Sequence, residues 1–194
     1  TFDLAPWCRD DWIEYLLGVH PARCTAVMSR ADRDPFGSSL RGLPGLWRLV
    51  LDELAADDNL TDVRSALRRS IDNLLAGSSL RQQLGACALA TLAKRSDAVS
   101  FAGVERHGVD GQTIRQLDQP AVRLLLAAEE VAGELGRREL PTCLSQPLPG
   151  PLIAEIGLGL SASEVARTTL REALKQAPDE FHPMVARSEE RRVG

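Results

Sequence analysis

The chain has 194 residues, of which 44% are hydrophobic and 26% charged, and its formal net charge is −4. This balance is typical of a folded globular chain and argues against a disordered one. An acidic chain has no general attraction to phosphate backbones, and no apolar stretch approaches the roughly 20 residues of a membrane-spanning helix, so we expect neither nucleic acid nor a membrane as a partner.

Residues 1–58 are predicted to form an N-terminal helical segment, which holds most of the aromatic residues of the chain. Apolar side chains at helical spacing predict three helices here, over 7–18, over 21–31 and from 44 to about 57, with a polar turn over 32–39. Large aromatic side chains at this spacing favour a packed core over a partner-binding surface. The acidic cluster of Asp10, Asp11 and Glu14 favours a solvated helix face over paired catalytic carboxylates.

Residues 59–146 are predicted to form the helical core of the chain. Thr61 is the expected N-cap of its first helix, which should end at Gly77, and Ser78 or Ser79 should cap the next. Glycines between residues 96 and 117 allow only short helices there. A long helix should then start after Asp118, with Pro120 in its first turn, and stop near Gly136.

Four of the predicted helices share a pattern of an aliphatic residue, an arginine, two variable residues and a leucine. The arginines of this pattern are Arg64, Arg81, Arg123 and Arg171. The stretch 118–128, Asp-Gln-Pro-Ala-Val-Arg-Leu-Leu-Leu-Ala-Ala, resembles the second helix of a HEAT-like, armadillo-type helical repeat, and residues 62–67 echo it. The resemblance extends over about residues 59–136.

This resemblance implies an all-α fold, an α-solenoid of stacked antiparallel helices. A two-helix unit cannot bury its apolar face alone, so neighbouring units stack, and small alanines permit the close approach. An arginine near the start of a helix can then bond to carboxylates or carbonyls of the adjoining unit. The alternative fold within the all-α class is a non-repeat helical bundle.

The C-terminal part of the chain is predicted to consist of a connector, helices and a tail. The proline-rich residues 147–151 should form a stiff, extended connector, followed by C-terminal helices over 152–186. The glycines of 157–161 should stop one helix, and a capping box over 161–164 should start the last one. Residues 187–194 resemble translated sequencing adapter, and the chain opens on Thr1, so we expect a gene fragment with a non-native tail.

An alternative function is suggested by residues 99–117, which resemble the helix-turn-helix of bacterial regulators. The base-reading candidates would be Gln112, Thr113, Arg115 and Gln116. Nearby acidic residues offset the arginines, however, and give phosphate little reason to bind. The segment is therefore more typical of an inter-helix loop.

The residues that could carry catalysis or bind a metal do not form a recognisable motif. Cys8, His20 and Cys24 could supply three metal ligands, but no fourth follows at a useful distance. The four cysteines are widely scattered and indicate reduced core residues of a cytoplasmic protein. We therefore predict a scaffold or regulatory protein–protein interaction module, part of a larger protein, with no enzymatic activity and no cofactor.

Overall fold

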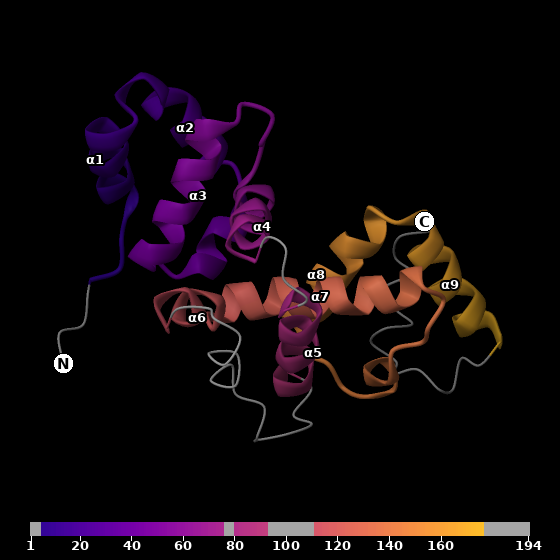
Figure 1. The fold of residues 1–194 in the computed structure, drawn as a ribbon. Helices are drawn as coiled ribbons and strands as arrows, with labels where there is room; N and C mark the ends of the chain where they lie inside the picture. The colour runs from indigo at the N-terminus through magenta and orange to yellow at the C-terminus, as the bar shows by residue number, and fades with distance from the viewer. Residues whose placement is uncertain (1–4, 76–79, 93–110, 177–194) are drawn as a thin grey trace. The chain divides into compact units, whose positions relative to one another are not determined.

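The computed structural model describes residues 5–75, 80–92 and 111–176, and it divides the chain into two compact units (Figure 1). The first unit comprises Thr1–Ser78 and Arg115–Val122, and the second comprises Ser79–Ile114 and Arg123–Gly194. Every regular element in the described ranges is a helix, which confirms the predicted all-α class. No helix within those ranges is both long and apolar enough to cross a bilayer.

Within its described residues, the first unit contains four complete α-helices and two short 3₁₀ helices. In chain order these are α1 (Arg9–Val19), η1 (Pro21–Arg23), α2 (Cys24–Ala31), η2 (Pro35–Leu40), α3 (Pro44–Ala56) and α4 (Val63–Leu74). The most extensive packing is between α3 and α4, and α2 also packs on α3. The core between these helices combines aliphatic side chains with Phe36 and with the indole of Trp47, whose ring centroid lies 3.8 Å from that of Trp12.

Two details of the first unit differ from the sequence predictions. The N-cap of α4 is Asp62 and not Thr61, because the Asp62 Oδ1 accepts the backbone N–H of Ser65 over 2.7 Å. Most of the segment predicted as a polar turn is the 3₁₀ helix η2. This short helix buries Phe36 and Leu40, and Asp34 caps it. The three helices predicted for residues 1–58 are confirmed.

The second unit holds the remaining helices of the described chain. These are α5 (Leu80–Leu92), α6 (Gly111–Leu117), α7 (Pro120–Gly136), η4 (Thr142–Ser145), α8 (Gly150–Ser161) and α9 (Glu164–Gln176), with the ends of α6 and α7 shared with the first unit. Small residues set the closest helix approaches. A Cβ on Gly85 of α5 would lie 3.1 Å from the carbonyl oxygen of Leu126 in α7, and one on Gly159 of α8 would lie 3.6 Å from the Ala132 Cβ.

Helix α8 corrects two predictions about the C-terminal part. It begins at Gly150, so Pro151 lies in its first turn rather than in an extended connector, where proline costs no intrahelical hydrogen bond. Gly157 and Gly159 lie inside α8 and do not stop it, since packing against α7 offsets the low helix propensity of Gly159. The cap of α9 is Ser163, whose Oγ accepts the backbone N–H of Ala166 over 3.3 Å.

The C-terminal end of α7 is a Schellman motif. The helix ends at Gly136, as predicted, but the left-handed residue that follows it is Arg138, with φ of 63°. The backbone N–H of Arg138 donates to the carbonyl oxygen of Leu135 over 3.0 Å, and that of Glu139 donates to Glu134 over 2.9 Å. A residue with a Cβ therefore occupies the position that usually belongs to glycine.

Candidate functional site

A hollow of about 490 Å³ lies along one face of α1 and is the candidate site of the first unit. Its lining residues are Trp7, Asp11, Glu14, Tyr15, Gly18 and Val19. Five of these lie on α1 itself, and their spacing of three and four residues brings their side chains onto one helix face. We call this set of residues the α1 hollow.

Two aromatic rings form one wall of the α1 hollow. The centroids of Trp7 and Tyr15 are 5.5 Å apart, with the ring planes inclined at 44°. This is the tilted geometry that aromatic pairs favour over face-to-face stacking. Trp7 precedes α1 and is held by its backbone N–H, which donates to the carbonyl oxygen of Gly42 over 2.6 Å. The backbone of Trp7 is therefore held next to the Tyr15 ring.

The phenol of Tyr15 is anchored on α3. Its hydroxyl donates to the Asp52 Oδ1 over 2.7 Å, and the Nε2 of His20 lies 2.9 Å from the same oxygen. Burial raises the pKa of the Tyr15 phenol, and the hydrogen bond to Asp52 raises it further, so the phenol stays protonated at neutral pH. Asp52 thus joins the middle of α1 and the segment after it to α3. The set of Tyr15, Asp52 and His20 contains no serine or cysteine. Its hydrogen bonds serve to position the Tyr15 ring.

The carboxylates of the α1 hollow differ in their environments. Asp11 accepts the backbone N–H of Cys8 over 2.7 Å, which lowers the pKa of this carboxyl and completes the cap of α1. Glu14 is exposed and makes no hydrogen bond or ion pair with any described residue. Asp11 and Glu14 were both predicted to lie on a solvated helix face, which is correct for Glu14. Their position beside an aromatic pair was not predicted.

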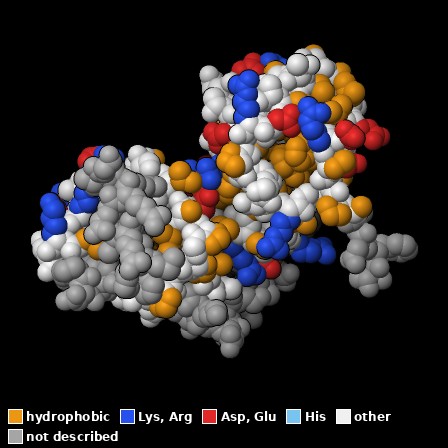
Figure 2. All heavy atoms as spheres, turned by 180° about the vertical axis from the view of Figure 1, so that it is seen from behind, with side chains coloured by type: hydrophobic (Ala, Val, Ile, Leu, Met, Phe, Trp, Pro, Cys, Tyr) orange, Lys and Arg blue, Asp and Glu red, His pale blue; other side chains and the backbone are white. Residues whose placement is uncertain are grey.

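Apolar side chains continue the surface at the C-terminal end of α1. Leu17 and Val19 are 56% and 53% exposed, the largest values among the large apolar side chains of the described residues. In Figure 2, apolar side chains reach the surface over the first unit between acidic and basic ones. Aromatic and apolar groups that stay exposed in a folded unit are typical of a contact surface.

The arginines of the repeat-like pattern lie in four different surroundings. Arg81 of α5 donates from Nη2 to the Glu129 Oε2 of α7 over 2.6 Å. Arg64 of α4 places its guanidinium carbon 4.6 Å from the ring centroid of Phe36. Arg123 is half-buried in the first turns of α7, and Arg171 is half-buried in the middle of α9.

The helix-turn-helix candidates lie on α6, a helix of seven residues. Arg115 is exposed, whereas Thr113 and Gln116 are half-buried, and the helix packs through Ile114 and Leu117. Gln112 lies on the same helix. The first helix and turn of that motif, residues 99–110, fall outside the described residues, as do Gly77, the two serine caps and the tail 187–194.

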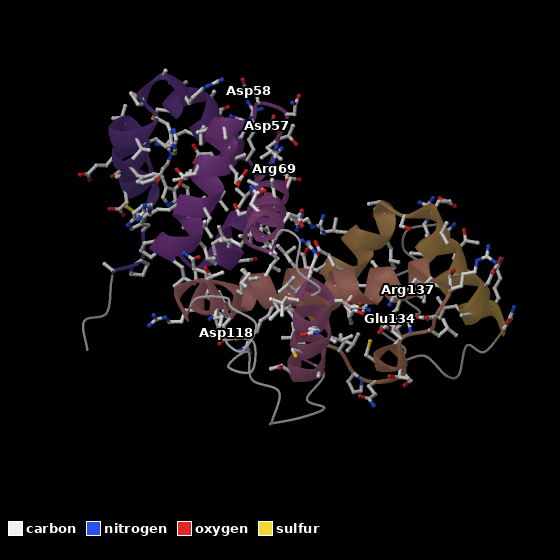
Figure 3. All side chains as sticks on the ribbon, viewed as in Figure 1. Asp57, Asp58, Arg69, Asp118, Glu134 and Arg137 are labelled. Atoms are coloured by element: carbon white, nitrogen blue, oxygen red, sulfur yellow. The ribbon has the colours of Figure 1, made fainter. Side chains whose placement is uncertain are left out.

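A polar cluster around the loop between α3 and α4 was not anticipated from the sequence (Figure 3). The guanidinium of Arg30, from α2, donates to the carbonyl oxygens of Leu54, Asp57 and Leu60 over 2.7, 3.0 and 2.7 Å. Arg69 of α4 pairs with Asp57 and lies 3.6 Å from a carboxylate oxygen of Glu53. The cluster supplies hydrogen-bond donors to backbone carbonyls at and after the C-terminal end of α3. Its partners lie far apart in the sequence, which explains why no local sequence pattern predicted it.

Other features of the described chain are weaker candidates for a functional site. A second hollow, of about 250 Å³, is lined by Arg138 and by the α9 residues Glu164, Val165, Thr168, Thr169 and Glu172. Within the described ranges, no three His, Cys, Asp or Glu side chains converge as a metal site. Comparison of the chain with models of protein families, with curated proteins and with solved structures finds no match.

Proposed function

We propose that the chain is a helical scaffold that acts as a protein–protein interaction module. The α1 hollow is the observation that carries this proposal. It combines a fixed Trp–Tyr pair with exposed aliphatic side chains, and tryptophan and tyrosine are the residues most enriched among those that dominate binding energy at interfaces. Because hydrogen bonds already hold the Tyr15 ring and the backbone of Trp7, a partner would lose less free energy in ordering this pair.

We further propose that the helices of the second unit stack in the manner of HEAT-like repeats. Support comes from the ion pair between Arg81 and Glu129 and from the close approach of α5 to α7 at Gly85. An arginine of the repeat-like pattern thereby bonds to a carboxylate of a helix that does not follow it directly in the chain, as expected if helical units stack.

A double-mutant cycle tests the stacking proposal. Arg81→Ala and Glu129→Ala, alone and together, should give a coupling energy of about 0.5–1 kcal/mol in urea unfolding, because both side chains are partly exposed. The control is Gln83→Ala with Glu129→Ala, which should be additive, since Gln83 is exposed on the same helix. Equal coupling in both cycles would contradict the stacking role of the arginine.

A peptide-display selection tests the interaction proposal. The whole chain is immobilised and used to select from a library of random peptides, and we expect enrichment of one family of related sequences. Val19→Asp should abolish this enrichment, because it places a charge at the end of the α1 hollow. Val165→Asp is the matched control, since Val165 is 50% exposed on α9, outside the hollow. Enrichment that survives Val19→Asp would exclude the α1 hollow as the binding surface.

A further inference from the structure

We propose that the α1 hollow accepts a positively charged side chain, so that the partner is a basic protein segment in which apolar residues flank a lysine or an arginine. This inference rests on the proposed function and specifies the chemistry of the partner. It is carried by three observations on the α1 hollow, which concern its charge, its aromatic wall and its apolar lining.

The charge of the α1 hollow is negative. Of its described lining residues, Asp11 and Glu14 are acidic and none is basic. The backbone N–H of Cys8 partly compensates Asp11, whereas Glu14 has no described partner. A carboxylate that lies beside a hollow and has no partner among the described residues can pair with a cation from another molecule.

The aromatic wall of the hollow suits the same ligand. The faces of tryptophan and tyrosine rings attract cations within about 6 Å of the ring centroid. The molecule already contains one example of this attraction, because the guanidinium carbon of Arg48 lies 5.6 Å from the centroid of the Tyr15 ring. Arg48 does not line the hollow, so the face of Trp7 and the acidic side of the hollow remain for a ligand.

The apolar surroundings account for the residues next to the cation. Val19 lines the hollow, and Leu17 is exposed on the same end of the helix. The methylene stem of a lysine or arginine packs on such apolar surface while its charged end reaches a carboxylate. A flanking apolar residue of the partner would cover Val19.

The experiment uses the whole chain and two synthetic peptides. The first peptide is acetyl-Ala-Leu-Lys-Ala-Leu-amide, and the second carries norleucine in place of the lysine. Binding is followed by NMR through the indole N–H signal of Trp7 and the amide signal of Glu14. We expect the lysine peptide to bind at least about fivefold more tightly than the norleucine peptide, as the sum of a cation–π contact and an exposed ion pair requires.

Two matched variants locate the charge. Glu14→Gln should weaken the lysine peptide about three- to fivefold and leave the norleucine peptide unchanged. Asp10→Asn removes the same charge from α1, but Asp10 lies outside the hollow, so binding should change by less than about 1.5-fold. Arg48→Gln should strengthen the lysine peptide, because it removes the competing cation from the Tyr15 ring.

Each alternative result has a distinct meaning. Equal weakening by Glu14→Gln and Asp10→Asn would overturn the inference, because a diffuse acidic field would then explain the binding. Equal affinity for both peptides, or no binding of either, would also overturn it. In these cases the interaction proposal would still stand if the display selection enriched neutral peptides that depend on Val19, so the two failures are distinguishable.

Discussion

The backbone N–H of Trp7 donates a hydrogen bond to the carbonyl oxygen of Gly42 over 2.6 Å. Gly42 has a φ of +66°, and a Cβ added to it would lie 2.8 Å from the Pro6 Cβ and 2.9 Å from the carbonyl oxygen of Trp7. The segment before α1 therefore lies directly against a left-handed glycine between η2 and α3. The aromatic wall of the α1 hollow depends on this contact.

We predict that Gly42→Ala lowers the free energy of unfolding by at least about 2 kcal/mol. The left-handed conformation costs a residue with a Cβ about 1–2 kcal/mol, and the contact with Pro6 and Trp7 adds an overpacking cost. Urea unfolding followed by tryptophan fluorescence measures the loss. The control is Gly18→Ala on α1, where a Cβ meets nothing within 4 Å and stability should rise slightly. Similar effects of both variants would show that Gly42 is not confined.

Replacement of Arg30 should be costly even when the charge is kept. Its side chain is 14% exposed and donates to four backbone carbonyls, those of Ala26, Leu54, Asp57 and Leu60, a fork that lysine cannot reproduce. We expect Arg30→Lys to destabilise by about 1–2 kcal/mol and Arg30→Met by about 3 kcal/mol. Arg23→Lys is the control, because Arg23 is exposed and pairs with exposed Asp58, and it should cost less than about 0.5 kcal/mol. If Arg30→Lys left the free energy of unfolding unchanged, the positive charge alone would be sufficient to stabilise the C-terminal end of α3.

Arg138→Gly should stabilise the protein by about 1 kcal/mol. Arg138 occupies the left-handed position of the Schellman motif, where glycine avoids the steric cost of the Cβ. Arg138→Ala keeps a Cβ and should change the stability by less than about 0.5 kcal/mol. Thermal unfolding of the two variants beside the unmodified chain separates these expectations. A loss of stability in Arg138→Gly would mean that unfolded-state entropy outweighs the relieved strain.

The Asp57 carboxylate should contribute to stability at neutral pH and lose this contribution in acid. The backbone N–H of Asn59 and the guanidinium of Arg69 lower its pKa in the folded chain. Since the folded pKa lies below the unfolded value of about 3.9, the contribution is complete above that value and is lost as pH falls through the folded pKa. The Tm difference between the unmodified chain and Asp57→Asn should therefore shrink between about pH 6 and pH 2.5. A constant difference over this range would contradict the role of the ionised form.

The sequence was sufficient to predict the helices but not the structures that cap their ends. Helices such as α3 and α7 follow from apolar periodicity and from Pro44, Pro120 and Gly136, which act locally. The left-handed residue after α7 did not follow, because arginine is not expected there and only the backbone hydrogen bonds identify it. The cap of α4 was misplaced by one residue for a similar reason, since Thr61 and Asp62 are both good caps.

The candidate site was predictable only in part. Asp11, Glu14 and Trp7 are close in the chain, and their acidic and aromatic character is visible in the sequence. Their arrangement around a hollow depends on Gly42 and Asp52, which lie far along the chain and bond to the backbone of Trp7 and to the hydroxyl of Tyr15. The hydrophobic periodicity of the sequence cannot predict such contacts, because they form only when α3 packs near α1.

The first unit is discontinuous in the chain, since Arg115–Val122 completes what Thr1–Ser78 begins. During synthesis at about 5–20 residues per second, the end of the completing stretch leaves the ribosome roughly 2–9 seconds after residue 78. Helices α1 to α4 therefore emerge from the ribosome before residues 115–122, which complete the unit, have emerged. Ribosome-stalled chains that end before and after the exposure of residue 122 should differ in protease resistance, and the N-terminal helices alone should be the more readily cleaved form.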